Sequence, residues 1–239
     1  MNSEQGFEEP KVEVRLTADG SATLYVPALD EHYHSTHGAR QESEHVFIQA
    51  GLLPLLDAGL GQPCRCPLRL LEIGLGTGLN ALLTLYHAQP AGAAVAYDGF
   101  EPRPLSAATV AALAPTWAAQ PGTVGTRFEA LHAAPWGEMH PLAPGFFLTK
   151  LPQSVQAAAL PAAYYDLIYF DAFAPEKQPD LWSAIVFQQL YAAAASAAVL
   201  VSYCAQGEFR RNLRAAGWRT ERLPGPPGKR EMTRAVKEA

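Results

Sequence analysis

The sequence predicts an α/β protein with a doubly wound, mostly parallel β-sheet, preceded by an N-terminal extension made of a β-hairpin and a helix. Two observations support this fold. From residue 68 onward, short apolar runs alternate with helical segments, which is the pattern of β-α-β units. The first run, LRLLEIG at residues 68–74, is nearly continuous rather than alternating, as in strands that are buried on both faces.

The N-terminal extension is expected at residues 1–60, before a main domain at 61–239. Two β-rich runs flank Asp19-Gly20, a dipeptide that favours a tight hairpin turn. In chain order, we expect a hairpin at 12–26, a polar histidine-rich stretch at 30–41, a helix at 42–57 and a loop at 59–67.

The main domain is expected to alternate strands with helices. The strands are expected at 68–74, 94–101, 164–173 and 197–203, with weaker candidates at 127–131 and 145–149. The helices are expected at 79–88, 104–119, 180–195 and 207–216. Right-handed crossovers between parallel strands bring the strand C-termini to one edge, where such sheets bind their ligands.

Composition limits the class of protein. Of the 239 residues, 49% are hydrophobic and 17% are charged, which is typical of a globular chain with a sizeable core. No apolar run reaches the roughly 20 residues of a membrane span. The first residues are acidic and polar, unlike a targeting segment, so we expect a cytoplasmic protein. Three cysteines are too few for a disulfide framework or a structural zinc site.

Charge is distributed unevenly along the chain. Residues 205–239 hold nine basic and four acidic residues, a net charge of +5, which leaves −10 on residues 1–204. A basic end can present a phosphate-binding surface on an acidic protein. A solvated helix face would account for the same charges.

A glycine-rich turn follows the first strand, in the string EIGLGTGLN from Glu72 to Asn80. Gly74, Gly76 and Gly78 permit a tight strand-to-helix turn to which a ligand can come close. Glu101 ends the next strand, where a carboxylate can accept hydrogen bonds from both ribose hydroxyls of an adenosine. The spacing is G-x-G-x-G, not the G-x-G-x-x-G of dinucleotide enzymes, and favours S-adenosylmethionine, a ligand without phosphates. A dinucleotide site and a purely structural turn are the alternatives.

Asp171 ends the strand at 164–173 and precedes Phe173-Ala174-Pro175. Methyl transfer to an amine requires an aligned, neutral nucleophile, whereas a free alkylamine is largely protonated at neutral pH. A carboxylate at the sheet edge can hold the amine and accept its proton, directly or through water. Asp171 is therefore the predicted catalytic residue, with a helix cap as the structural alternative.

Together these motifs resemble the methyltransferase domain of MnmC, and especially the stand-alone MnmC-like methyltransferases that lack the flavin oxidase half. The resemblance covers residues 29–235. Its most specific strings are EIGLGTGLN at 72–80, DAFAPEKQPDLW at 171–182 and GKREM at 228–232. Further marks are Asp30-Glu31, Tyr33, Ser35, Gly38, Glu42, Val46-Phe47, Phe100-Glu101, Phe187, Gly207, Arg210-Arg211, Leu213 and Ala216-Gly217.

The resemblance implies methylation of the exocyclic amine of 5-aminomethyluridine, or its 2-thio form, at the tRNA wobble position. The cofactor would be S-adenosylmethionine, and a separate enzyme would supply the aminomethyl group. The residues expected to bind the cofactor are Glu72, Gly74, Gly76, Gly78, Asn80 and Glu101. A wobble base must leave the anticodon stack to be modified, and aromatic side chains can stack on it. The residues expected to bind tRNA are Tyr33, Phe173, Trp182, Arg210, Arg211, Lys229 and Arg230.

Two features depart from a simple match. The family pattern places Gly-Asp where this sequence has Thr149-Lys150, and the Asp can face the adenine amino group. Gln153 or Ser154 could substitute, or apolar and backbone contacts could hold the adenine. His32, His34 and His37 invite a metal interpretation, but the resembling segment carries no ligands, so we expect no metal.

Two other functions remain open from the sequence. A methyltransferase or aminopropyltransferase of a small polyamine shares the fold but would need an acidic pocket and no basic end. A catalytically inactive RNA-binding scaffold is disfavoured because the glycines, Glu101 and Asp171 are all present.

Overall fold

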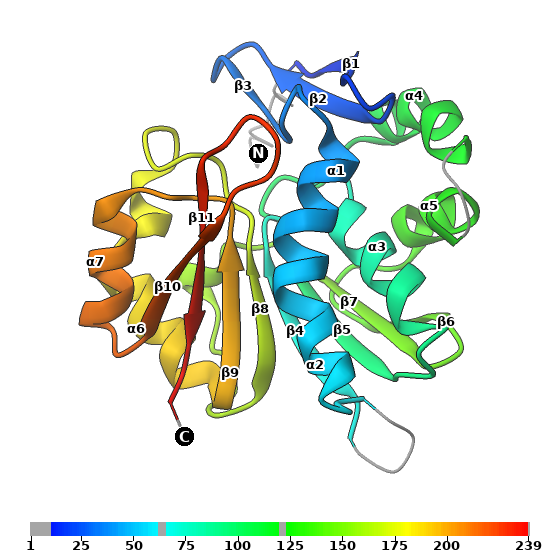
Figure 1. The fold of residues 1–239 in the computed structure, drawn as a ribbon. Helices are drawn as coiled ribbons and strands as arrows, with labels where there is room; N and C mark the ends of the chain where they lie inside the picture. Colours follow the sequence, from blue (N-terminus) through cyan, green and yellow to red (C-terminus); the bar gives the residue numbers. More distant parts are fainter. Residues whose placement is uncertain (1–10, 62–65, 120–122, 239) are drawn as a thin grey trace, which may run out of the picture.

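The structure, a computed structural model, describes residues 11–61, 66–119 and 123–238. Eight strands form the main sheet in the order β10-β11-β9-β8-β4-β5-β7-β6, and β1-β2-β3 form a separate small sheet (Figure 1). The strands are β1 (Glu13–Leu16), β2 (Ala22–Val26), β3 (Glu31–His32), β4 (Leu68–Ile73), β5 (Val95–Phe100), β6 (Met139–Ala143), β7 (Phe146–Leu151), β8 (Tyr165–Phe170), β9 (Ala194–Ser202), β10 (Arg219–Pro224) and β11 (Glu231–Val236).

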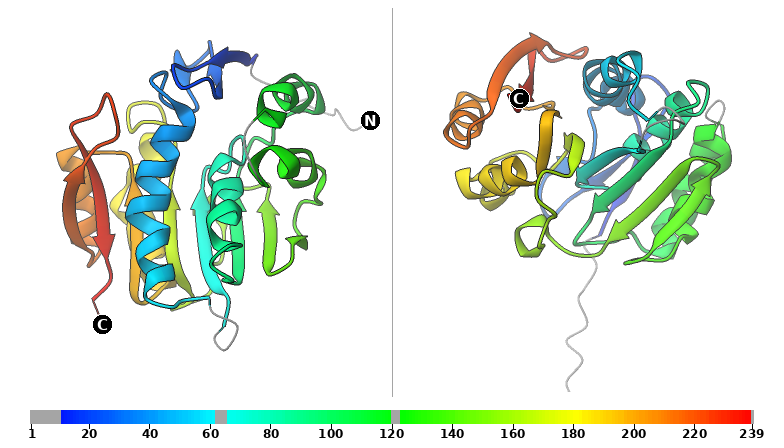
Figure 2. Two further views of the ribbon diagram at one scale, coloured as in Figure 1. Left: turned by 45° about the vertical axis from the view of Figure 1, so that its right-hand side comes forward. Right: turned by 90° about the horizontal axis from the view of Figure 1, so that it is seen from below.

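The helices flank both faces of the main sheet (Figure 2). They are α1 (Ala39–Ser43), a π-helical stretch η1 (Glu44–Leu52), α2 (Leu53–Asp57), α3 (Leu79–Ala88), α4 (Ala107–Ala118), α5 (Thr123–Ala133), α6 (Ala184–Ala193) and α7 (Gly207–Ala215). Two short 3-10 turns, η2 (Val155–Ala157) and η3 (Pro179–Trp182), complete the set. Among the described residues, no helix is long and apolar enough to cross a membrane.

The five central strands are parallel, and antiparallel strands are added at both edges. This confirms the predicted doubly wound, mostly parallel sheet. The N-terminal hairpin is also confirmed, because β1 and β2 pair in antiparallel fashion. The helix predicted at 42–57 is present and begins earlier, at Ala39. Part of the predicted loop at 59–67, residues 62–65, lies outside the described residues.

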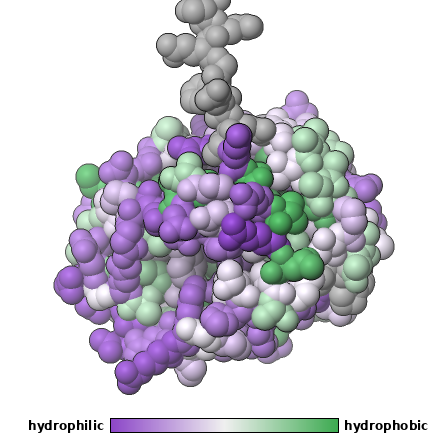
Figure 3. Space-filling model, turned by 90° about the horizontal axis from the view of Figure 1, so that it is seen from above, coloured by the Kyte–Doolittle hydropathy of each residue, from purple (hydrophilic) through white to green (hydrophobic). Residues whose placement is uncertain are grey.

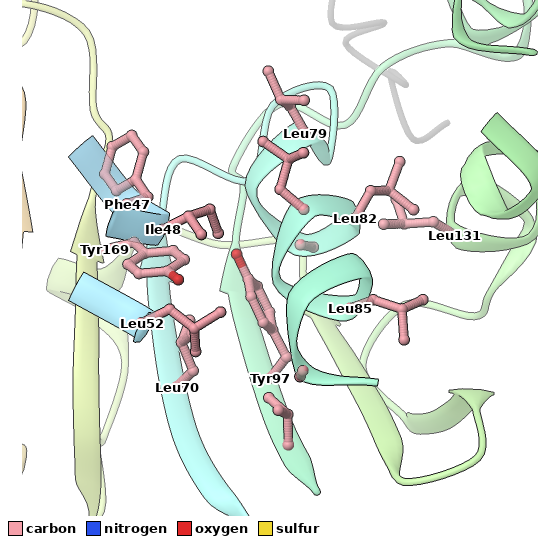
Figure 4. Packing of buried hydrophobic residues seen from close by; sticks show 14 of the residues in the cluster. Phe47, Ile48, Leu52, Leu70, Leu79, Leu82, Leu85, Tyr97, Leu131 and Tyr169 are labelled. Carbon is pink, nitrogen blue, oxygen red and sulfur yellow. The ribbon is translucent and has the colours of Figure 1, made fainter. Parts of the chain in front are cut away.

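The central strands are buried on both faces, as their continuous apolar runs predict. In β8, Leu167 and Tyr169 belong to one core cluster, and Ile168 and Phe170 belong to the other. This alternation follows from the two-residue period of a strand. Figure 4 shows the first cluster, where Phe47 of the π-helical stretch lies beside Tyr169. Their ring centroids are 5.1 Å apart.

The predicted strand at 127–131 is wrong, because these residues lie inside α5. Phe128 and Leu131 are both buried and three positions apart, so a helix turns both toward the core. Leu131 faces α3, where Figure 4 shows it near Leu82. The strand expected at 145–149 is confirmed as β7.

The C-terminal hairpin, β10 and β11, was not predicted. Its strands are rich in charged residues and add to β9 as antiparallel neighbours. The basic residues of this region are therefore spread over α7, the two strands, the turn between them and the segment after β11, and do not share one solvated helix face. The turn between the two strands reaches the small N-terminal sheet above the strand ends (Figure 1). Both ends of the chain thus contribute to the ligand-binding edge.

Candidate active site

A cavity of about 440 Å³ lies at the carboxyl ends of β4, β5 and β8. This volume is within the range of roughly 300–1,000 Å³ that is usual for small-molecule sites. The outer face above these strand ends mixes hydrophilic residues with smaller hydrophobic patches (Figure 3). Asp171 lies beside Gly74, and the charges of Glu42 and Lys229 act on its carboxyl. After the ligands that the sequence predicts, we call Gly74–Gly76, Glu101, Arg103 and Ser154 the cofactor half of the cavity, and Tyr33, Glu42, Phe173, Tyr203 and Lys229 the acceptor half.

The glycine turn forms the wall of the cofactor half. Gly74 has φ +90°, and a Cβ there would lie 2.5 Å from the Asp171 carbonyl oxygen. Gly76 has φ +50°, and a Cβ there would lie 3.0 Å from the Tyr33 ring. Both glycines line the cavity, whereas Gly78 does not, since it packs against Leu131. Gly78 therefore shapes the turn from behind the cavity wall.

Glu101 follows β5 directly and lines the cavity from a buried position. Its Oε2 accepts the Gly76 N–H at 3.0 Å, and its Oε1 accepts the Arg103 N–H at 2.9 Å. Burial raises the pKa of Glu101, while these two N–H groups and the Arg103 charge oppose that rise. The two backbone bonds hold the carboxylate against the glycine turn, where its remaining lone pairs can serve a ligand.

Glu72 and Asn80 lie behind the wall and do not line the cavity. The Asn80 amide nitrogen donates to Glu72 Oε1 at 2.9 Å and to Asp171 Oδ2 at 2.8 Å. The Tyr97 hydroxyl donates to Glu72 Oε2 at 2.7 Å. Burial raises the pKa of Glu72 well above its ordinary value. Both residues were predicted to bind the cofactor; the geometry instead makes them supports that fix the turn and orient Asp171.

Asp171 is a half-buried residue that lines the cavity. Its backbone N–H donates to the Ile73 carbonyl at 2.9 Å, which holds the end of β8 beside the glycine turn. Burial raises the pKa of the Asp171 carboxyl to about 7, and the Glu42 charge adds to the rise. The Asn80 hydrogen bond and the Lys229 charge oppose it. A carboxyl that titrates near neutral pH is suited to exchange a proton with a ligand.

Two aromatic rings form part of the acceptor half. Tyr33 and Phe173 meet edge to face with ring centroids 5.0 Å apart, and both line the cavity. Tyr33 comes from the segment after β3, and Phe173 comes from the loop after β8. Burial raises the pKa of the Tyr33 hydroxyl. The pair offers a neutral, largely apolar surface to a planar ligand.

Lys229 also reaches the acceptor half, from the turn between β10 and β11. Its Nζ lies 2.5 Å from Glu42 Oε1 and 4.1 Å from the centre of the Tyr203 ring. The Tyr203 hydroxyl donates to the Ala172 carbonyl at 2.8 Å, so this ring is fixed to the loop after Asp171. Lys229 is therefore a cavity residue whose ammonium is paired with Glu42, while 35% of its side chain remains exposed.

Two residues predicted to contact tRNA belong to the interior. The Trp182 indole is buried against Phe170 and donates to the Phe173 carbonyl at 2.9 Å. Arg210 is 4% exposed and donates to Thr233 Oγ1 at 3.0 Å and to Glu231 Oε2 at 2.9 Å. Their side chains connect α7 and the loops to the sheet, and this burial argues against the predicted contact with tRNA. Arg211 and Arg230 are exposed, as a tRNA surface requires.

The position expected to recognise adenine contains a lysine that faces elsewhere. Lys150 is buried, donates to the His132 carbonyl at 2.8 Å and lies 4.7 Å from the centre of the Trp136 ring. Burial lowers its pKa to about 8. Of the two substitutes considered, Ser154 lines the cavity together with Val155, while Gln153 is exposed outside it.

The sequence analysis missed Glu42, Tyr203 and Arg103 as cavity residues. Glu42 was available as a mark of the family resemblance, but no local pattern indicated its contact with Lys229. The histidines at 32, 34 and 37 do not gather into a ligand set. Within the described ranges, no group of three or more His, Cys, Asp or Glu side chains could hold a metal ion. Cys64 lies outside those ranges.

Comparisons with known proteins identify several similar sequences. Residues 149–238 match a family described as S-adenosyl-L-methionine-dependent methyltransferase. The bifunctional protein MnmC of Ralstonia nicotianae, named for tRNA 5-methylaminomethyl-2-thiouridine biosynthesis, is 33% identical over 93% of this chain and 34% of its own length. The protein of that name from Magnetococcus marinus is 34% identical over 90% of this chain and 32% of its own length. This chain thus spans about a third of these relatives.

A solved structure covers nearly the whole chain. The crystal structure of MNMC2 from Aquifex aeolicus aligns with a TM-score of 0.78 and 25% identity, over 97% of this chain and 72% of that one.

Proposed function

We propose that this chain, which belongs to the MnmC-like S-adenosylmethionine-dependent methyltransferases, methylates the exocyclic amine of 5-aminomethyluridine, or its 2-thio form, at the tRNA wobble position. The observation that carries the proposal is Asp171, a half-buried carboxyl with a pKa of about 7 that lines the cavity between the glycine turn and the Glu42–Lys229 pair. The biosynthetic pathway named for the relatives supports the choice of acceptor.

The cofactor half fits S-adenosylmethionine. Gly74 and Gly76 leave space that a Cβ would fill, and Glu101 is held with lone pairs available for the two ribose hydroxyls. Ser154 is our candidate for the polar contact to adenine, with Val155 beneath the ring. When bound, this cofactor supplies an electrophilic methyl group on a sulfonium centre.

Asp171 would hold the acceptor amine and take up its proton. An alkylamine attacks a methyl group only through its free lone pair, and the ordinary pKa of such an amine is about 10.4. A base whose pKa lies near the working pH has the best compromise between availability and basicity. Asn80 keeps the Asp171 carboxylate in one orientation through its 2.8 Å bond, so the amine would meet a fixed acceptor.

The acceptor base would enter beside Tyr33 and Phe173. A wobble nucleotide must be turned out of the anticodon stack, and aromatic rings compensate for the lost stacking. Arg211 on α7 and Arg230 in the turn between β10 and β11 are exposed, and Arg230 lines an outer pocket together with Lys229. We assign both arginines to the tRNA backbone. The aminomethyl group would come from a separate enzyme.

A small polyamine is the second candidate acceptor. The observation that favours it is the presence of Glu31 and Glu42 in the same cavity as Asp171, since three carboxylates suit a polycation. Lys229 already neutralises Glu42, which weakens this case.

Methyl transfer to two acceptors would separate these functions. Purified protein with labelled S-adenosylmethionine would be offered tRNA that carries 5-aminomethyluridine at the wobble position, or spermidine at equal amine concentration. We expect label in the tRNA, at the exocyclic nitrogen, and at least about a hundredfold less in spermidine, because charge alone gives poor discrimination without base contacts. Label in spermidine alone would replace the proposed acceptor, and label in neither would remove the proposed function.

A further inference from the structure

Two segments from opposite ends of the chain place an ion pair inside the acceptor half. Glu42 lies in α1, and Lys229 lies 187 residues later in the turn between β10 and β11. The Lys229 Nζ is 2.5 Å from Glu42 Oε1, and the Ser35 N–H donates to Glu42 Oε2 at 2.8 Å. The Glu42 side chain is 8% exposed. The carboxylate is therefore fixed on both oxygens, one by a cation and one by the backbone.

The backbone contacts of the turn between β10 and β11 fix the main-chain position of Lys229. Gly228 has φ +87°, and a Cβ there would come within 2.5 Å of the His37 ring. The Lys229 N–H donates to the Pro226 carbonyl at 2.9 Å, and the Gly225 N–H donates to the Arg230 carbonyl at 3.1 Å. With its ammonium also over the Tyr203 ring, Lys229 is directed into the cavity by several contacts. Such preorganisation is unusual for a lysine that serves only as a mobile surface charge.

Three titratable groups next to this pair, His34, Tyr203 and Cys204, are neutral near pH 7. Burial lowers the pKa of His34 to about 4, which keeps that ring neutral. Burial also raises the pKa of Tyr203 and raises that of the Cys204 thiol to about 11, so both stay protonated and neutral. The remaining groups that line the cavity are Glu31, His32 and Tyr33 from the N-terminal segment, and Glu101 and Arg103 from the loop after β5.

Among the described residues that line the cavity, Lys229 and Arg103 carry the permanent positive charges. The Arg103 charge acts on Glu101 and Tyr33, whereas the Lys229 charge acts on Asp171 and His34. A cation next to a titrating group favours its deprotonated form, and an anion favours the protonated form. The two members of the pair therefore act on a neighbouring proton in opposite directions.

We propose that the Glu42–Lys229 pair sets the protonation of the reacting centre, with Lys229 favouring a neutral acceptor amine and an ionised Asp171, and Glu42 opposing it. This inference rests on the proposed function. The pKa of the acceptor amine and the pKa of Asp171 change in the same direction. Removal of the Lys229 charge raises both, so each group becomes harder to deprotonate. Lys229 is then a positioning residue that acts through charge and does not contact the transferred methyl group.

The test is a set of pH–rate profiles with tRNA that carries 5-aminomethyluridine. The wild-type rate is expected to rise with pH to a plateau, since the reaction needs the amine neutral and Asp171 ionised. Lys229→Met should move the midpoint of this rise upward by about one pH unit or more, the effect of one charge at close range, and lower the rate at pH 7 about tenfold. Glu42→Gln should move the midpoint downward.

Three further variants keep the test decisive if single substitutions disturb folding. Lys229→Arg keeps the charge and should keep the wild-type midpoint. The double variant Glu42→Gln with Lys229→Met removes both charges and should return the midpoint toward wild type. Arg222→Gln removes an exposed cation from the same hairpin, with a side chain that is 72% exposed, and should leave the midpoint unchanged. Calorimetric binding of the nucleoside 5-aminomethyluridine at pH 7 adds a readout without turnover: wild type should release more protons than Lys229→Met.

Two results would overturn the inference. If Lys229→Met raises only the KM for tRNA and flattens its salt dependence, Lys229 is a phosphate contact. If its midpoint stays with that of wild type, the pair is structural. Failure of the proposed function is visible separately, because wild-type protein would then not label the tRNA at all.

Discussion

The two halves of the cavity are built in different ways. In the cofactor half, Glu101 contacts Gly76 over a separation of 25 residues, within one β-α-β unit. In the acceptor half, Glu42 contacts Lys229 over 187 residues, and each comes from a segment outside the parallel strands. The first half depends on a local turn, and the second depends on how both chain ends fold onto the sheet. Among proteins with this fold, the cofactor site can thus be retained while the acceptor site differs, because the acceptor site depends on the segments outside the parallel strands.

Asp171 belongs to both halves, and its removal should have the largest effect. Asp171→Asn keeps the size of the side chain and one acceptor oxygen but removes the charge. Turnover should fall by about 10²–10⁴, the range expected for a positioned general base. Affinities for S-adenosylmethionine and tRNA, measured by calorimetry, should change much less. Activity within about threefold of wild type at neutral pH would reduce Asp171 to a loop cap.

Stability provides the control for this variant. The folded-state pKa of Asp171 is raised from 3.8 to about 7, so burial penalises the ionised form. Its contribution to stability is greatest below pH 3.8 and is lost as the pH rises through about 7. Asp171→Asn removes this loss. In denaturant titrations, the variant should gain stability relative to wild type between pH 5 and pH 8, about one to a few kcal/mol. A variant that loses both activity and stability would be simply misfolded.

Glu101 tests the cofactor half alone. If Glu101 binds the ribose as proposed, Glu101→Ala removes charge-assisted hydrogen bonds that are each worth about 1.5–3 kcal/mol. Affinity for S-adenosylmethionine should weaken at least about tenfold, while the midpoint of the pH–rate profile at saturating cofactor should remain that of wild type. Glu101→Gln is the matched control, since it keeps the shape and one acceptor. Undiminished cofactor affinity in Glu101→Ala would remove Glu101 from the cofactor half.

The same contrast explains what the sequence could predict. The central strands, the glycine turn, Glu101 and Asp171 follow from apolar runs and residues at strand ends, which are local signals. The error at 127–131 arose because Phe128 and Leu131 fit a short apolar run as well as a helix face. Trp182 and Arg210 were assigned to tRNA because residue type alone does not reveal burial.

The contact of Glu42 with Lys229 depends on long-range packing, which no local pattern encodes. The division of the chain at residue 60 remains a prediction.

The smallest expected effect lies outside both halves, at the proposed tRNA surface. Arg211→Gln combined with Arg230→Gln should raise the KM for tRNA severalfold and reduce the slope of log KM against log salt by about two, one for each lost phosphate contact. Cofactor affinity and the midpoint of the pH–rate profile should not change.

Arg210→Gln is the matched control, because Arg210 has the same charge but is bonded to Glu231 and Thr233 in the interior. That variant should lower the free energy of unfolding by about 1–3 kcal/mol and leave the salt slope unchanged. The measurements are steady-state kinetics between 50 and 200 mM salt, with tRNA varied at saturating S-adenosylmethionine. If the double variant leaves the slope unchanged, the hairpin of β1 and β2 becomes the next candidate surface for tRNA.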